Sequence, residues 1–135
     1  MNDQAQAELK KIFNGRFSTS ESTRANYARG EDTYDPVLSK AVVFPETNEE
    51  VSKILTLCNK HKIPVVPFGT GTSLEGNVVG NDKGITISLE KMNKILSVNA
   101  EDFDCRVQAC VTKEQLNEYL REDGVFFPID PGANA

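Results

Sequence analysis

Residues 64–76 read PVVPFGTGTSLEG, a short apolar run that leads directly into a loop of glycine and hydroxyl residues. Glycine has no Cβ, so such a loop adopts positive φ readily and lets a ligand come close to the main chain. Successive backbone N–H groups in this kind of loop form a nest for an anion, and the hydroxyls add further donors. The glycines stand at 69, 71 and 76, a spacing that fits neither the Walker loop nor the Rossmann fingerprint. The stretch therefore predicts a phosphate or pyrophosphate site of another type at the end of a buried strand.

The pattern of the whole chain predicts an α+β fold. Helices are expected at 4–13, at 20–29, and after capping boxes at 47–50 and 112–115. Strands are expected at 41–44, 65–68, 85–89, 95–98, 104–111 and 125–127. The first three strands and the helices around them predict a small parallel three-stranded sheet with flanking helices. The next two predict an antiparallel pair that begins a second α+β part.

Composition and charge exclude several classes of protein. The chain has 135 residues, 39% hydrophobic and 26% charged, which suits a single globular domain. Its net charge of −5 argues against a nucleic-acid surface, which needs clustered lysine and arginine. No apolar run approaches the roughly 20 residues of a membrane span, and the first residues lack the pattern of a signal or transit peptide. We therefore expect a cytoplasmic protein with no membrane span and no nucleic-acid partner.

The cysteines and the single histidine indicate no catalytic or metal site. Cys58, Cys105 and Cys110 lack C-x-x-C spacing, so packed, reduced thiols are expected. Cys105 and Cys110 are predicted to lie on opposite faces of one strand. His61 is expected to be a solvated residue at a helix end, where a cation complements the helix dipole.

Four stretches of the chain, in order, resemble one family of flavoproteins. Residues 67–76, PFGTGTSLEG, closely resemble the pyrophosphate loop of the FAD-binding domain shared by vanillyl-alcohol oxidase and p-cresol methylhydroxylase. The other three are 41–47 (AVVFPET), similar to the family's entry strand, 99–103 (NAEDF), similar to the start of its second lobe, and 127–133 (FPIDPGA), similar to the run before a second flavin contact. Within the family, the chain looks most like the D-lactate dehydrogenase and glycolate oxidase flavoprotein branch. The resemblance implies an N-terminal helical segment (1–40), the first lobe of an FAD-binding domain (41–93) and the start of a truncated second lobe (94–135).

The resemblance also assigns residues to the flavin. The loop contains no lysine or arginine, so neutral N–H and O–H donors would have to satisfy the pyrophosphate charges. Some relatives carry, at the position of Thr72, a histidine that bonds to the flavin, whereas a threonine implies non-covalent FAD. The expected cofactor-binding residues are Gly69, Thr70, Gly71, Thr72 and Ser73 at the pyrophosphate, Val66, Pro67 and Phe68 beside it, Gly76 near the ribityl or ring side, and Pro131 and Gly132 at the second contact.

For the intact protein, the resemblance implies a flavin-dependent oxidoreductase that takes two electrons from a small 2-hydroxy acid such as D-lactate or glycolate. The electron acceptor is unidentified. The family's catalytic residues would lie beyond Ala135, so no catalytic residue and no metal ligand is assigned here. We interpret the chain as an N-terminal fragment without turnover, whose truncated sheet edge favours self-association.

Other interpretations remain open at this point. Glycine and threonine are common in turns, so the loop could be no more than a surface turn after a strand. Residues 130–132 could likewise be a turn, with Asp130 capping local N–H groups. A chain that kept this fold could also be a flavin-free binding or regulatory module, or an interaction domain that recruits a partner.

Overall fold

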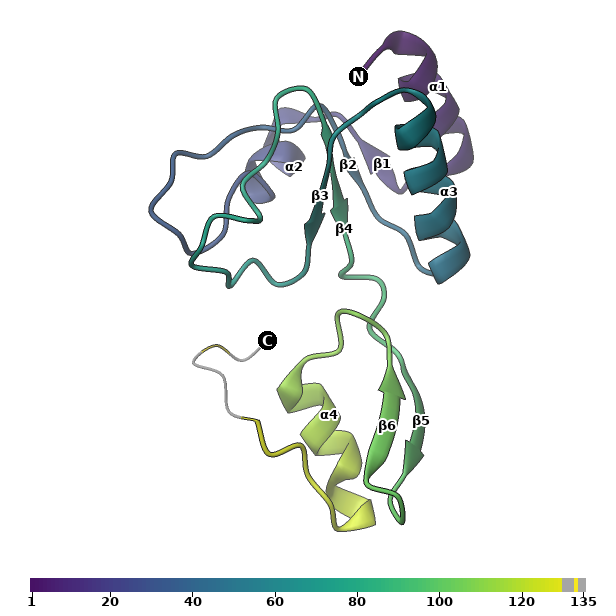
Figure 1. The fold of residues 1–135 in the computed structure, drawn as a ribbon, viewed down its shortest axis with the longest axis vertical. Helices are drawn as coiled ribbons and strands as arrows, with labels where there is room; N and C mark the ends of the chain where they lie inside the picture. Colours follow the sequence, from purple (N-terminus) through teal and green to yellow (C-terminus); the bar gives the residue numbers. More distant parts are fainter. Residues whose placement is uncertain (130–132, 134–135) are drawn as a thin grey trace. The chain divides into compact units, whose positions relative to one another are not determined.

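A computed structural model describes residues 1–129 and 133 of the chain (Figure 1). Two compact units make up the chain, Met1–Lys91 and Met92–Ala135. Pro131 and Gly132, the expected second flavin contact, lie outside the described residues.

The first unit is built on four strands: β1 (Phe17–Ser18), β2 (Val42–Val43), β3 (Val65–Phe68) and β4 (Ile85–Ser88). They form one sheet in the order β1-β2-β4-β3. β2, β4 and β3 run parallel, which confirms the predicted three-stranded parallel sheet. β1 adds an antiparallel strand within residues 1–40, where the pattern predicts only helices. Its two residues are too few to show the period of a strand.

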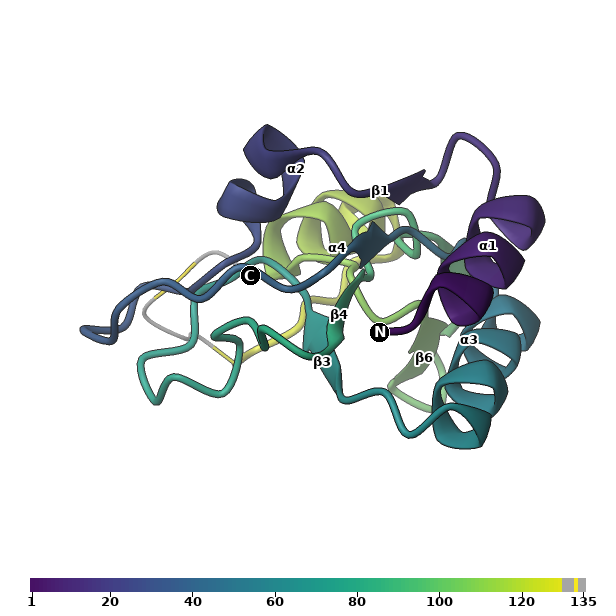
Figure 2. The same cartoon turned by 90° about the horizontal axis from the view of Figure 1, so that it is seen from above.

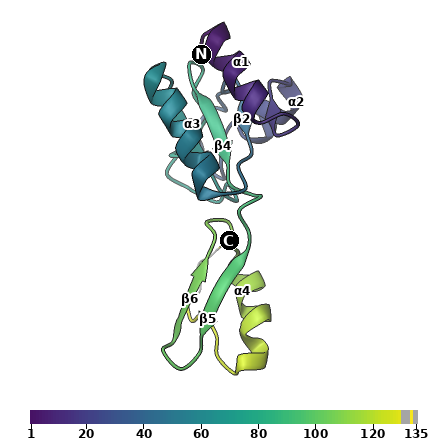
Figure 3. The same ribbon diagram turned by 90° about the vertical axis from the view of Figure 1, so that its right-hand side faces the viewer.

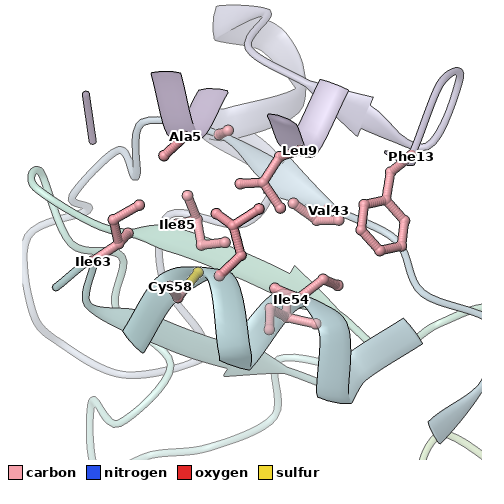
Figure 4. Close-up of a cluster of buried hydrophobic side chains, with 11 residues drawn as sticks. Ala5, Leu9, Phe13, Val43, Ile54, Cys58, Ile63 and Ile85 are labelled. Atoms are coloured by element: carbon pink, nitrogen blue, oxygen red, sulfur yellow. The ribbon is translucent and has the colours of Figure 1, made fainter. Parts of the chain in front are cut away.

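Helices α1 (Asp3–Ile12) and α3 (Asn48–Lys60) lie side by side against one face of this sheet (Figures 2 and 3). A shorter helix, α2 (Glu21–Asn26), occupies part of the stretch 20–29 predicted as helical. Apolar side chains of α1, α3 and the sheet meet in a single core (Figure 4). Its buried members are Ala5, Leu9, Phe13, Ala41, Val43, Ile54, Leu57, Cys58, Ile63, Ile85 and Ile87.

The sheet has a covered centre and a free edge at β3. All four residues of β4 are buried, and on the face opposite the core Thr86 donates its hydroxyl to Ser39 Oγ at 2.8 Å. At the edge, the carbonyls of Pro64 and Phe68 accept N–H groups from the β4 side. Because main-chain N–H and C=O groups alternate between the two sides of a strand, the main-chain groups of Pro67, which is exposed, face the free edge.

An ion pair joins the start of β1 to the start of α3. Thr47 Oγ1 accepts the Glu50 N–H at 3.2 Å, as the capping box predicts. The Glu50 carboxylate, however, accepts hydrogen bonds from both terminal guanidinium nitrogens of Arg16 at 2.6 Å and from the Glu46 N–H at 2.7 Å. The hydrogen bond from Arg16 is the largest cause that lowers the pKa of Glu50 to about 2.

The second unit consists of a hairpin and a helix (Figure 3). Strands β5 (Ile95–Asn99) and β6 (Asp104–Val107) pair antiparallel, as predicted, and α4 (Lys113–Leu120) begins at the predicted Thr112 cap. A short 3-10 helix, Arg121–Asp123, follows and ends at Gly124 with φ 70. The hairpin, α4 and the following segment enclose an apolar pocket of about 100 Å³.

Two sequence predictions about this unit were wrong. β6 ends at Val107, so Cys110 lies outside the strand that was predicted to carry it. Residues 125–127 form no strand, because no other described strand pairs with them.

Candidate cofactor site

The glycine loop, residues 69–76, begins where β3 ends (Figure 1). Because β2, β3 and β4 are parallel, their carboxyl ends share one edge, which is where open α/β sheets bind ligands. Aromatic rings support this edge: the Tyr27 ring lies edge-on to Phe44 at 5.6 Å and to Phe68 at 5.1 Å between ring centres. The Tyr27 hydroxyl donates to Glu90 Oε2 at 2.6 Å, just after β4.

The three glycines of the loop have different surroundings. A Cβ on Gly71, which has φ 78, would lie 2.7 Å from Phe68 Cζ. A Cβ on Gly76, which has φ 74, would lie 2.5 Å from the Tyr34 ring. A Cβ on Gly69 would meet nothing within 4 Å. Gly71 and Gly76 are therefore required by packing and backbone conformation, whereas Gly69 leaves open space beside the main chain.

The loop has backbone donors that the described residues leave unpaired. The backbone N–H groups of Gly69 to Ser73 make no hydrogen bond to another described residue. The hydroxyls of Thr70 and Thr72 lie 3.4 Å apart on the exposed part of the loop. The Ser73 hydroxyl is engaged within the loop, because it donates to Asn77 Oδ1 and accepts the Glu75 N–H. Ser73 can thus offer an anion its N–H. Thr70 and Thr72 can offer both N–H groups and, because one of their hydroxyls donates to the other, one O–H.

The other predicted residues of this stretch lie in β3, directly before the loop. Val66 is half-buried within the β3 ladder, and Pro67 is exposed at the free edge. Phe68 is 6% exposed, with its ring beneath Gly71, so it supports the loop from below. The loop carries no cationic side chain, and neutral dipoles in a nest are the type of donor it can supply to an anion.

The connector between α2 and β2, residues 27–39, belongs to this site, although its polar sequence is typical of a surface loop. It supplies Tyr27 under the loop and Tyr34 against Gly76. The Glu31 N–H donates to the Gly71 carbonyl at 3.0 Å. Two signals in the sequence indicate a tight, structured turn here: a glycine at 30 and an aspartate two residues later.

His61 and the cysteines lie away from the loop. The His61 side chain is only 9% exposed, with its Nδ1 3.4 Å from Asn2 Nδ2 and its Nε2 3.7 Å from Glu8 Oε1, so the prediction of a solvated residue was wrong. All three cysteines are free. Cys58 is packed as predicted, and burial raises the pKa of its thiol to about 11. Cys105 is exposed, which contradicts the expectation that all three are packed.

In the part of the chain that the structure describes, no cluster of three or more His, Cys, Asp or Glu residues is arranged to hold a metal ion. None of the helices there combines the length and apolarity that crossing a bilayer requires.

A family model described as FAD binding domain matches residues 39–135. Among curated proteins, a protein of Danio rerio named "Probable D-lactate dehydrogenase, mitochondrial" is 42% identical over 118 residues, which are 87% of this chain and 24% of that protein. The glycolate oxidase subunit GlcD of Bacillus subtilis is 31% identical over 117 residues, 87% of this chain and 25% of that protein. The chain thus spans about a quarter of the length of these curated relatives.

Solved structures of low sequence identity share the fold. An alkyldihydroxyacetonephosphate synthase matches with a TM-score of 0.87 at 21% identity, over 97% of this chain and 27% of that one. A p-cresol methylhydroxylase with substrate bound matches with a TM-score of 0.78 at 23% identity, over 90% of this chain and 25% of that one. The α+β fold class and the resemblance to flavoproteins of this type are therefore confirmed.

Proposed function

This chain belongs to the FAD binding domain family, with FAD as its cofactor, and from that premise we propose that Gly69 to Ser73 hold the FAD pyrophosphate. One observation carries the proposal: the N–H groups of Gly69 to Ser73 have no acceptor among the described residues, and the main chain at Gly69 borders open space. An anion that enters this space would receive hydrogen bonds that the protein leaves unmade. The residues present therefore fit a diphosphate, and the fit needs no cationic side chain.

The remaining cofactor contacts are proposed on the same basis. Val66, Pro67 and Phe68 would support the loop from the strand, and Gly76 would let the chain pass close to the ribityl or ring side. Pro131 and Gly132 would supply a second contact. We propose that FAD is bound non-covalently, because the hydroxyl of Thr72 does not form the bond that a histidine forms with a flavin.

For the intact protein we propose an oxidoreductase that removes two electrons and two protons from a small 2-hydroxy acid and yields the 2-oxo acid. The names of the two relatives, a D-lactate dehydrogenase and a glycolate oxidase subunit, support this substrate class. FAD supplies the electron-accepting chemistry, and the residues of this chain bind and orient it. We assign no catalytic residue in this chain and expect no D-lactate-to-dye activity from residues 1–135 alone. The electron acceptor stays unassigned.

A titration of the ¹⁵N-labelled chain followed by amide chemical shifts tests the binding site. FAD and adenosine diphosphate both carry a diphosphate, so both should shift the amides of Gly69 to Ser73. Riboflavin carries the ring without a diphosphate and is the matched control, which should leave these amides unshifted. Shifts by riboflavin alone, or shifts by FAD confined to other residues, would place the cofactor elsewhere. No shift with any of the three ligands would favour a flavin-free binding or interaction module.

The cytoplasm stays the proposed compartment, and the three free cysteines favour reducing surroundings over a compartment in which disulfides form. The name of the Danio rerio relative includes the word mitochondrial. Imaging of the whole protein with a C-terminal fluorescent tag distinguishes the two, and a mitochondrial signal would contradict the proposal.

A further inference from the structure

We propose that the connector, residues 27–39, sets the shape of the glycine loop, and that Asp32 is the positioning residue that fixes the connector. The inference rests on the proposed function in one respect, namely that the anion at the loop is the FAD pyrophosphate. The connector and the glycine loop lie side by side, although about forty residues separate them in sequence (Figures 1 and 2).

Asp32 holds the connector in a tight turn. The residue is 8% exposed, and its carboxylate accepts two hydrogen bonds. Oδ2 accepts the Gly30 N–H at 3.1 Å, and Oδ1 accepts the Tyr34 N–H at 2.9 Å. Because both oxygens are used, neutral or shorter side chains at this position lose at least part of the turn.

The turned connector contacts the loop through main-chain atoms. The Glu31 N–H donates to the Gly71 carbonyl at 3.0 Å. A Cβ on Gly30 would lie 2.7 Å from that same carbonyl oxygen and 2.9 Å from the Ser73 carbonyl oxygen, so the two main chains touch. Further along, the Ala28 carbonyl accepts the Gly80 N–H at 2.9 Å.

These contacts determine where the loop donors point. The described chain contains no cis peptide bond. In a trans peptide the C=O of one residue and the N–H of the next point in opposite directions. The Gly71 carbonyl is directed at Glu31, so the Thr72 N–H is directed away from the connector. The Ser73 carbonyl faces Gly30 in the same way, so the Leu74 N–H also points away from it. The connector thereby directs the N–H groups of Thr72 and Leu74 away from itself, and Thr72 is one of the residues proposed to hold the diphosphate.

Asp32→Ala and Asp32→Asn test the inference, with Asp35→Ala as the matched control, because Asp35 is an exposed aspartate of the same connector. In the ligand-free chain, Asp32→Ala should speed hydrogen exchange of the Glu31 amide by about tenfold or more and shift the Thr72 and Leu74 amides. Exchange of core amides in α3 should not change. Affinity for adenosine diphosphate should fall by about tenfold. Asp32→Asn keeps one acceptor oxygen and should rescue part of both effects, and the control should stay within about twofold.

Gly30→Ala provides a second variant if Asp32→Ala does not fold. Its methyl group must displace the Gly71 and Ser73 carbonyls, so the Thr72 and Leu74 amides should shift again. Unchanged exchange at Glu31 together with unchanged affinity in the Asp32 variants would overturn the positioning role. A wild-type chain that binds neither FAD nor adenosine diphosphate at the loop would instead overturn the proposed function. The exchange rates of the free chain would still decide whether Asp32 shapes the loop.

Discussion

Replacing Gly69 and Gly71 one at a time by alanine separates ligand binding from loop stability. Both glycines belong to the same loop, and both substitutions add a single methyl group. The structure gives that methyl group opposite surroundings, because it meets open space at residue 69 and the ring of Phe68 at residue 71. The pair is therefore its own control.

The expected magnitudes follow from these surroundings. At Gly71, a left-handed φ of 78 costs an alanine about 1–2 kcal/mol. The 2.7 Å approach to Phe68 Cζ adds about 1 kcal/mol of crowding. Gly71→Ala should therefore lower the free energy of unfolding by about 2–3 kcal/mol, which corresponds to a fall of roughly 10 °C in Tm. At Gly69, φ lies outside the left-handed region. Alanine there should be neutral or stabilise the fold by about 0.4–1 kcal/mol, because it reduces the conformational entropy of the unfolded chain.

Thermal unfolding followed by circular dichroism measures the stability of the two variants, and the amide-shift titration measures their affinity for FAD. Gly69→Ala should keep the wild-type Tm and bind FAD at least about tenfold more weakly, because its methyl group occupies the space assigned to the diphosphate. Wild-type affinity in Gly69→Ala would show that the anion does not lie there. A Tm loss at Gly69 equal to that at Gly71 would refute the distinction between the two glycines.

Three further outcomes are expected. Glu50→Gln should lower the free energy of unfolding at pH 7 by about 1–3 kcal/mol in urea titrations. The folded pKa of Glu50, about 2, lies below its ordinary value of 4.5, so this contribution is complete above about pH 4.5 and is lost as the pH falls through about 2. A difference in unfolding free energy between wild type and Glu50→Gln that is as large at pH 2 as at pH 7 would contradict the Arg16 pairing. Iodoacetamide at pH 8 should modify exposed Cys105 and spare buried Cys58, as mass spectrometry would show; equal labelling of both would mean that α3 opens. Multi-angle light scattering should detect concentration-dependent self-association of the 135-residue chain, since Leu96, Phe126 and other apolar side chains of the second unit are exposed. A monomer at every concentration would contradict this.

The sequence predicts those parts of the fold whose signals are local. The run before the glycine loop, the caps at Thr47 and Thr112, and the helix end at Gly124 depend on a few neighbouring residues, and the structure has each of them. β1 depends instead on the pairing of Phe17 with Val43, which is distant in sequence. A strand of two residues is too short to show an alternating pattern. The sequence pattern therefore misses elements, such as β1, that form only because a partner distant in sequence pairs with them.

The same distinction applies to the site. Glycine and hydroxyl residues in one stretch are enough to predict an anion loop. Gly71 is required because the Phe68 ring lies beside it, whereas Gly69 borders open space, and this difference depends on the position of the Phe68 ring in the fold. The part played by Asp32 depends on a fold that brings the connector against the loop. Neither arrangement can be obtained from residue type and spacing alone.

Pro67 has a consequence for how the sheet ends. Strands at an edge can accept an incoming strand from another molecule, because their outward N–H and C=O groups are unpaired. Along the outward side of β3, Val65 provides an N–H, whereas Pro67 provides none. An invading strand would lose a ladder hydrogen bond and meet the pyrrolidine ring directly before the glycine loop. The proline thus disfavours growth of this sheet into aggregates at the edge that leads into the loop proposed to hold the cofactor.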